Sequence, residues 1–418
     1  MIQMRNLHTL KEQKVRWCCS PSTGGWQREV IIKLYKKGES HEDLGFSPFW
    51  EDGAFWRREP GSRWGGHSMK LSKSQEERAK ELHQKCLVFD MHSDIQCEVI
   101  RRRSLGETHI LNRVFYKPLR KGGVDAIWFS TPPHLMHYPS YRGDYIQAGM
   151  HCMDVTLVEL EECKDHFVLA TKTRNILDAK KTGKIAVLLG FEGADPVGEN
   201  LGNVRNFYRL GLREIQLTWN YKNQVCDGIY EKRNAGLTEF GRELIKEMNR
   251  LGILIDTSHI NSQGLEDAIE LSSQPIYMSH ASSRDLVDHP RNITDEQARG
   301  IAKKGGAIGI CFLPQFVALK GATIEHVLDH LDHFVELVGS EHVGLGPDFI
   351  DYCLEVMTDA LKGMAYDSGE TFRYPKAIED TSKLLNMTRG MVARGYSDQD
   401  IENVLGGSML RVMEKVIG

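Results

Sequence analysis

The sequence predicts an α/β fold of eight strand–helix units, the (β/α)8 or TIM barrel, and two observations lead to this prediction. Short apolar runs rich in β-branched residues recur along the chain and are bounded by turn residues, as buried strands are. Helical patterns lie between most of these runs, and buried strands that alternate with helices pair in parallel. The roughly 340 residues that contain the runs suit this barrel with loop insertions. The eight runs are 86–94, 124–130, 184–192, 212–219, 252–259, 274–280, 306–313 and 342–348.

Composition excludes several classes of protein. The chain has 418 residues, of which 41% are hydrophobic and 26% charged, as in ordinary globular proteins. A net charge of −4 without a basic block argues against nucleic-acid binding. No apolar run approaches the roughly 18–20 residues that span a bilayer, and neither end reads as a secretory signal or an anchor. Nine cysteines without Cys-x-x-Cys spacing indicate reduced thiols. We therefore expect a cytoplasmic protein with no nucleic-acid and no membrane partner.

Residues 1–72 differ from the rest of the chain. They hold five of the seven tryptophans together with many glycine, serine and charged residues, and they show no clear period. Two interpretations stay open: an added arm or cap anchored by the tryptophans, or a stretch upstream of a biological start at Met69. The sequence thus predicts an N-terminal extension over 1–72 and a barrel domain with C-terminal helices over 73–418.

The first strand–helix unit begins just after this extension. Ser72 or Ser74 is placed to cap a helix over 75–85. The strand that follows closes on His92 and Asp94. Because these residues are two apart, their side chains would point to the same side of a strand and reach one metal ion.

The third predicted strand ends on a carboxylate, and the fourth ends on an aromatic residue. A long loop with three prolines follows the second strand, and a helix over about 144–165 comes next. The third strand ends on Glu192, and burying a lone carboxylate is costly unless a partner such as a metal ion holds it. The fourth strand ends on Trp219 and Asn220.

The second half of the chain shows the clearest helix. The apolar residues of 237–251 share one face, which predicts an amphipathic helix with Thr238 as N-cap and Gly252 as its stop. Further helices over about 262–272 and 323–338 precede the sixth and eighth strands, and a helical region closes the chain.

Five ligand-type residues stand at four strand ends, and in a (β/α)8 barrel the C-terminal strand ends meet around one site. Imidazole and carboxylate groups suit zinc or a similar divalent ion. Five ligands exceed one tetrahedral site, so they favour two ions bridged by Glu192. A lone strand-end histidine is more often structural, but the set predicts a barrel of metal-dependent hydrolase type. The five are His92 and Asp94 for one ion, His259 and His280 for the other, and Glu192 between them.

Two further charged residues are candidates for chemistry and for binding. Asp348 ends the eighth strand, where it would serve as a proton shuttle, or merely cap a loop. Arg291 lies in a polar loop after the sixth strand, where it would hold a substrate carboxylate through two hydrogen bonds, or lie in solvent.

From about residue 75 to 415 the chain resembles the membrane dipeptidase (renal dipeptidase) family, the M19 metallopeptidases. The order and spacing of the matching motifs agree across all eight strands. The motifs are Asp90-Met-His-Ser-Asp94, Phe191-Glu-Gly193, Leu217-Thr218, Gly236-Leu-Thr-Glu-Phe-Gly241, Ile255-Asp-Thr-Ser-His259, Ser279-His280, Arg291-Asn292, Gly346-Pro-Asp-Phe349 and Leu410-Arg411.

The resemblance implies a barrel with two Zn²⁺ ions and hydrolysis of dipeptides, often with tolerance for a D residue at the C-terminal side. It implies the same ligand assignment as above, with Glu192 as the bridging and catalytic carboxylate. It further implies that Arg291 holds the dipeptide carboxylate and that Asp348 is the acid/base. A homodimer is a further expectation.

The chain departs from the family pattern at one residue that bears on the substrate. Animal members have a substrate-contacting histidine after Leu-Thr on the fourth strand, where this chain has Trp219. We expect Trp219 to line the substrate pocket rather than to pack in the barrel wall. Either another group such as Asn220 or Asn223 then supplies the missing hydrogen bond, or the enzyme is slower on ordinary dipeptides. Smaller departures are Ser93 and Ser408, where the family has asparagine.

The sequence therefore predicts a zinc-dependent dipeptidase. Two rivals remain: a two-metal hydrolase of another amide or a β-lactam, and a catalytically silent barrel that binds a small ligand.

Overall fold

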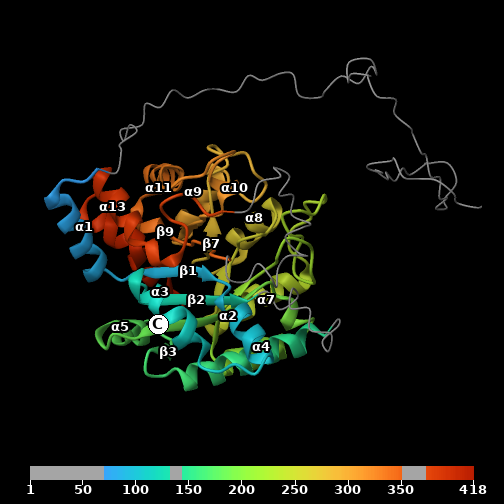
Figure 1. Ribbon diagram of the computed structural model, residues 1–418. Helices are drawn as coiled ribbons and strands as arrows, with labels where there is room; N and C mark the ends of the chain where they lie inside the picture. Colours follow the sequence, from blue (N-terminus) through green and yellow to red (C-terminus); the bar gives the residue numbers. More distant parts are fainter. Residues whose placement is uncertain (1–69, 132–143, 351–372) are drawn as a thin grey trace, which may run out of the picture. The chain divides into compact units, whose positions relative to one another are not determined.

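The computed structural model describes residues 70–131, 144–350 and 373–418 (Figure 1). Eight strands pair in parallel in the order β6-β5-β4-β2-β1-β9-β8-β7. The two end strands meet through a parallel bridge between Asp256 and Tyr277, so the sheet curls into a nearly closed barrel. The predicted (β/α)8 fold is confirmed. Most of the 1–72 extension and the proline-rich loop after the second strand lie outside the described residues.

The strands are shorter than the apolar runs that predicted them, because the last residues of several runs leave the ladder to form the rim. A three-residue strand, β3, was not predicted; it pairs with the start of β4. The bounds are β1 Phe89–Ser93, β2 Ala126–Thr131, β3 Phe167–Leu169, β4 Ile185–Glu192, β5 Leu212–Gln216, β6 Leu254–Asp256, β7 Met278–Ala281, β8 Ile308–Ile310 and β9 Val343–Leu345.

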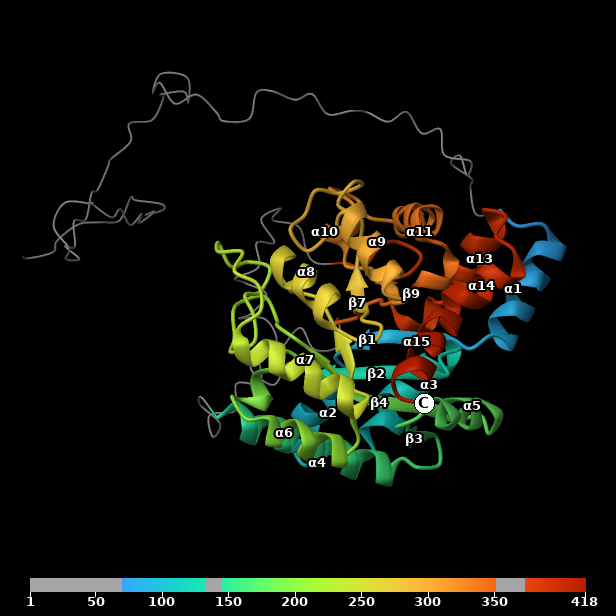
Figure 2. The same cartoon turned by 180° about the vertical axis from the view of Figure 1, so that it is seen from behind.

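Helices surround the strands (Figures 1 and 2). The five that were predicted are present: α1 Lys73–Lys85, α4 Tyr145–Glu162, α7 Glu239–Leu251, α8 Ser262–Leu271 and α11 Ile324–Val338. The others are α2 Ile95–Ser104, α3 Tyr116–Lys121, α5 Thr173–Lys181, α6 Leu201–Arg209, α9 Asp295–Lys303, α10 Pro314–Val317, α13 Leu385–Ala393, α14 Asp398–Glu402 and α15 Ser408–Val416, with short turns at Leu111–Phe115, Asp195–Val197, Ser340–His342, Thr381–Lys383 and Asn403–Gly407. Among the described residues, none of these helices combines the length and the apolar character that a bilayer crossing needs.

Local sequence explains where the predicted helices begin and end. Ser72 caps α1, because its hydroxyl accepts from the Gln75 N–H while the Gln75 side chain accepts from the Ser72 N–H. Thr238 caps α7 through a single hydrogen bond, which its hydroxyl accepts from the Gly241 N–H. Gly252 ends α7 at a φ of 73°, a conformation that disfavours side chains with a Cβ.

The apolar core has two layers, and the inner one extends to a helix that covers one end of the barrel. One apolar layer lies between strands and helices, and a second fills the barrel interior. Met409 and Val412 of α15 belong to the interior layer, and Arg411 of the same helix donates to the carbonyls of Gly305 and Gly306 ahead of β8. Helix α15 therefore covers the N-terminal end of the barrel and leaves the C-terminal strand ends for function.

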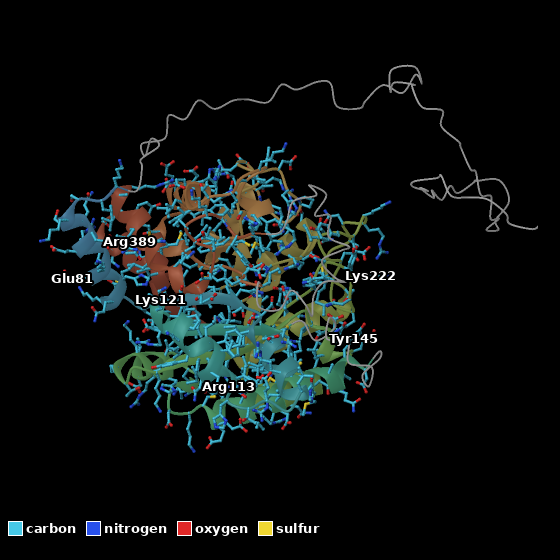
Figure 3. All side chains as sticks on the ribbon, in the orientation of Figure 1. Glu81, Arg113, Lys121, Tyr145, Lys222 and Arg389 are labelled. Carbon is cyan, nitrogen blue, oxygen red and sulfur yellow. The ribbon has the colours of Figure 1, made fainter. Side chains whose placement is uncertain are left out.

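Figure 3 labels side chains at both ends of the barrel. Glu81 and Lys121 lie at the side where β1 and β2 begin, and Lys222 and Tyr145 lie at the side toward which these strands point. Arg389 of α13 forms a 2.5 Å ion pair with Glu76 of α1, which connects the first helix to the C-terminal region.

Candidate metal centre

The five predicted ligand residues lie together at the C-terminal strand ends, and all are buried. Glu192 is the last residue of β4, and His280 lies in β7. His92 lies in β1, whose pairing with β2 shifts register between Asp90 and Ser93. Such an irregularity redirects side chains at a strand end. Asp94 falls just beyond β1, as the N-cap residue of α2.

Glu192 stands at the centre of the group. Its Oε1 lies 3.1 Å from His259 Nε2, 3.6 Å from His92 Nε2 and 3.8 Å from His280 Nε2. Two candidate metal groups share this carboxylate, each with its ligand atoms within 4.8 Å of one another. They are His92, Asp94 and Glu192, and Glu192, His259 and His280.

The unsatisfied atoms of these side chains fit metal ions. His92 Nε2, Asp94 Oδ1 and Glu192 Oε2 are buried and find no hydrogen-bond partner within the described part of the chain. Buried polar atoms are normally paired, so such orphans need an explanation. His259 Nε2 and His280 Nε2 also face each other at 2.8 Å. A cation that accepts all these lone pairs would satisfy the whole set.

Burial shifts the pKa values of the candidate ligand residues and so changes which of them are charged. It raises the pKa of Glu192 and of Asp94 well above the usual range and lowers the pKa of His92 to about 3. Neutral imidazole is the form that binds a metal ion. Two buried carboxylates, by contrast, need a neighbouring positive charge to stay ionised.

The backbone is strained at two site residues. Four non-glycine residues among those described have a positive φ, and His259 at 64° and Asp348 at 56° are two of them. Such conformations are costly for residues with a Cβ and concentrate where function requires them.

Asp348 and Arg291 lie beside the ligand groups. Asp348 Oδ1 is 3.8 Å from His92 Nε2, and burial raises the pKa of Asp348 to about 7, against the lowering effect of Arg291. The Arg291 guanidinium lies 5.5 Å above the Phe316 ring, and only 5% of the residue is exposed. Its Nη2 finds no partner among the described residues. A buried guanidinium with a free edge is suited to an incoming carboxylate.

Trp219 and Asn220 both reach the ring of His259. The Trp219 ring centroid is 6.0 Å from that of His259, with 23° between the planes, and only 8% of Trp219 is exposed. Asn220 Oδ1 is 2.7 Å from His259 Nδ1. The contact between Asn220 and the candidate ligand His259 was not predicted, and the expected contact of Asn220 with substrate stays a prediction.

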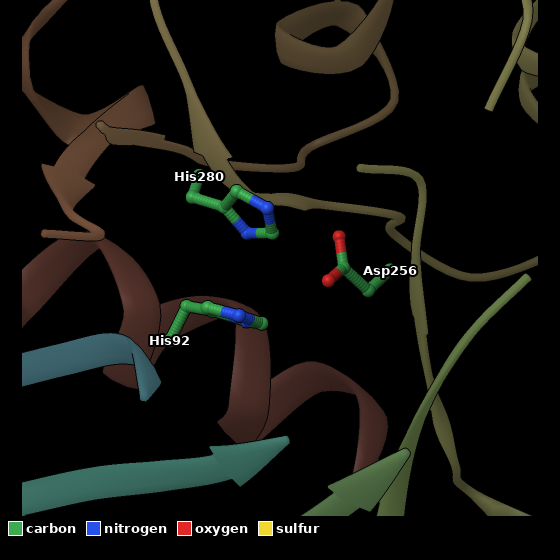
Figure 4. A group of neighbouring side chains, drawn as sticks. All are labelled: His92, Asp256 and His280. Atoms are coloured by element: carbon green, nitrogen blue, oxygen red, sulfur yellow. The ribbon is translucent and has the colours of Figure 1, made fainter. Parts of the chain in front are cut away.

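One carboxylate near the ligands was missed from the sequence. Figure 4 shows Asp256, the last residue of β6, with its carboxylate directed toward the rings of His92 and His280. Atoms of these three residues also lie within 4.8 Å of one another. The signal was the one that identified Glu192, because Asp256 too ends a buried apolar run.

The comparisons with known proteins agree with this geometry. Residues 76–362 match the family described as Membrane dipeptidase (Peptidase family M19). Dipeptidase verJ of Clonostachys rogersoniana is 30% identical over 273 residues, which are 65% of this chain and 66% of that protein, so the match spans just under two thirds of that relative.

Solved structures show the same fold. An amidohydrolase from Pseudomonas aeruginosa is 28% identical, with a TM-score of 0.70 over 81% of this chain and 98% of that one. A metallo peptidase from Rhodobacter sphaeroides, liganded with a phosphinate mimic of the dipeptide L-Ala-D-Ala, is 23% identical, with a TM-score of 0.67 over 79% of this chain and 99% of that one.

Proposed function

The chain belongs to the membrane dipeptidase family, peptidase family M19, and from that premise we propose that it is a zinc-dependent dipeptidase with two Zn²⁺ ions per chain. The observation that carries this proposal is the pair of buried ligand groups that share Glu192. His92 and Asp94 would hold one ion, and His259 and His280 the other. Glu192 would bridge the two.

Bound metal ions at such a centre supply a Lewis acid for the peptide carbonyl and lower the pKa of a bound water. The remaining chemistry belongs to the protein. Asp348 accepts the proton of the attacking water and delivers it to the leaving amine. Arg291 binds the free C-terminal carboxylate of the substrate through two hydrogen bonds, which restricts the site to short peptides. Trp219 presents an apolar ring beside His259 and so lines the pocket for a substrate side chain.

A dipeptide is the substrate that these positions favour. Arg291 and Asp348 are both buried, and Asp348 lies beside His92. Burial raises the pKa of both Asp348 and Glu192, and the Arg291 charge opposes this effect at both, so a carboxylate bound at Arg291 would lie a short distance from the reacting bond. The dipeptide mimic bound to the Rhodobacter sphaeroides peptidase supports the same substrate class, including a D residue at the C-terminal side.

We further propose a cytoplasmic location and a homodimer. The six cysteines among the described residues are all free, which agrees with reduced thiols. Light scattering of the purified chain measures the oligomeric state, and a monomer at micromolar concentration would contradict the dimer.

Metal content and turnover test the proposal together. The zinc-loaded full chain should contain about two ions per chain, because the two ligand groups need one ion each. It should also hydrolyse members of a panel of L,L and L,D dipeptides. Elemental analysis that finds at most one ion contradicts the two-metal centre, and a fully loaded protein that cleaves no dipeptide contradicts the substrate class.

A further inference from the structure

The His280 ring has a second polar contact on the edge opposite to its Nε2 atom. His280 Nδ1 lies 2.8 Å from the hydroxyl oxygen of Ser279, and that hydroxyl lies 2.5 Å from Asp256 Oδ2. All three residues are fully buried. A hydroxyl thus connects a ligand histidine on β7 to a carboxylate at the end of the neighbouring strand β6.

Asp256 differs from the carboxylates that face the metal groups, because protein donors occupy both of its oxygens. Oδ1 accepts from the Ser258 N–H at 2.9 Å, from the Ser279 N–H at 3.0 Å and from the Ser258 hydroxyl at 3.0 Å. Oδ2 accepts from the Ser279 hydroxyl. Asp94 and Glu192, in contrast, each keep one buried oxygen without a partner in the described chain. Burial raises the pKa of Asp256, and the four donated hydrogen bonds oppose that effect because they stabilise the ionised form.

The positions of the protons along this contact determine the tautomer of the His280 ring. The Ser279 hydroxyl donates its single proton to Asp256 Oδ2, so it has none left to give to His280. The Ser279 oxygen then accepts a hydrogen bond from His280, which places the imidazole proton on Nδ1. A neutral imidazole carries one ring proton, so the Nε2 lone pair is left to face Glu192 and His259.

We propose that Asp256 and Ser279 are positioning residues that hold His280 as its Nδ1–H tautomer and thereby direct the Nε2 lone pair to the metal ion. This inference rests on the proposed metal centre. His259 receives matching support from a different residue, because its Nδ1 lies 2.7 Å from Asn220 Oδ1. Both histidines of the second metal group therefore have an acceptor behind them, as metal-bound histidines usually do.

The substitution Asp256→Asn reverses the direction of the contact. Three donors surround Oδ1, so the amide oxygen of the new side chain should occupy that place and its NH2 group should face Ser279. Ser279 would then accept from the amide and donate to His280 Nδ1. The ring proton moves to Nε2, where it blocks metal binding. Ser279→Ala only removes the contact and leaves the tautomer free.

The proposal therefore predicts an order of metal affinities. Loss of a supporting partner typically weakens metal binding about 10–100-fold. We expect Ser279→Ala to weaken zinc binding about 10-fold and Asp256→Asn about 100-fold. Thr257→Ala is the matched control, because Thr257 is equally buried beside Asp256 but its hydroxyl donates to the Tyr277 carbonyl at 2.9 Å. Its zinc affinity should stay within about 3-fold of the unmodified chain.

The affinities are measured on the full chain, stripped of metal, by competition for Zn²⁺ with a chelator of known affinity. Thermal unfolding of the metal-free variants reports any general loss of structure. If the zinc affinities of the variants only follow their Tm values, and Asp256→Asn binds zinc no more weakly than Ser279→Ala, the proposal is wrong. Unchanged zinc binding in Ser279→Ala would also overturn it, and would favour Asp256 as a direct ligand.

A second measurement needs neither zinc nor the substitutions at Ser279 and Asp256. Histidine ¹⁵N chemical shifts of the metal-free full chain report which ring nitrogen carries the proton. We expect His280 to be protonated at Nδ1, and the signal to be identified from its loss in His280→Gln. A proton on Nε2 would refute the inference whatever the variants do. If the unmodified chain shows the Nδ1 proton but binds no zinc, the proposed function fails while the hydrogen-bond arrangement stands.

Discussion

Replacement of Arg291 tests substrate binding most directly. The guanidinium is buried, and its Nη2 has no partner within the described chain, so no protein group has to be displaced when a carboxylate arrives. Hydrogen bonds to charged groups contribute about 1.5–3 kcal/mol each. Two such bonds, reduced by the cost of removing water from the carboxylate, should contribute about 2–4 kcal/mol. At about 1.4 kcal/mol per factor of ten, Arg291→Ala should lower kcat/KM for a dipeptide about 30- to 1000-fold.

A comparison of a dipeptide with its C-terminal amide isolates this contact. The unmodified chain should prefer the free acid by about the factor lost in Arg291→Ala, and the variant should treat both substrates alike. Arg291→Lys keeps the positive charge but cannot bind a carboxylate through two nitrogens, so it separates recognition from the electrostatic effect on Asp348. Lys222→Ala, which removes a charge from the same side of the barrel, is the matched control. Equal losses on acid and amide in Arg291→Ala would refute carboxylate binding.

Three further substitutions test other parts of the structure. Asp348→Asn should keep its metal ions and lose about 10²–10⁴ in kcat, since a proton shuttle is typically worth that factor; unchanged kcat would exclude the role. Trp219→His should change the relative kcat/KM among dipeptides with different side chains at constant metal content, and a uniform change would show that Trp219 does not shape the pocket. Hydrogen bonds from Arg250, and then from Arg205, lower the pKa of Glu247 to about 2. Glu247→Gln should therefore reduce the free energy of unfolding by about 1 kcal/mol at pH 7. Urea unfolding should show this difference shrinking below pH 4.5 and vanishing as the pH falls through about 2.

The barrel could be predicted from sequence because each strand is an apolar run with its own boundary signals. All eight runs contain strands of the barrel, and the caps at Ser72 and Thr238 were visible as local motifs. Strand β3 was missed because three residues are too few to establish a period. Five of the eight strand ends were predicted one to three residues too long, because periodicity does not reveal where the chain leaves the ladder. After β6 ends at Asp256, the chain reaches His259 in a positive φ that the sequence pattern does not indicate.

The grouping of the candidate ligand residues could be predicted from the sequence, but their hydrogen bonds could not. A carboxylate or histidine at the end of an apolar run is visible one residue at a time, and the barrel brings such residues together. The roles of Ser279 and Asp256 depend on the registry of β7 against β6, since a hydroxyl from one strand must meet a carboxylate of the other. The same holds for Asn220, which reaches His259 from a different strand end. Sequence pattern therefore identifies candidate metal ligands one residue at a time, whereas contacts between strands determine the hydrogen bonds behind their rings.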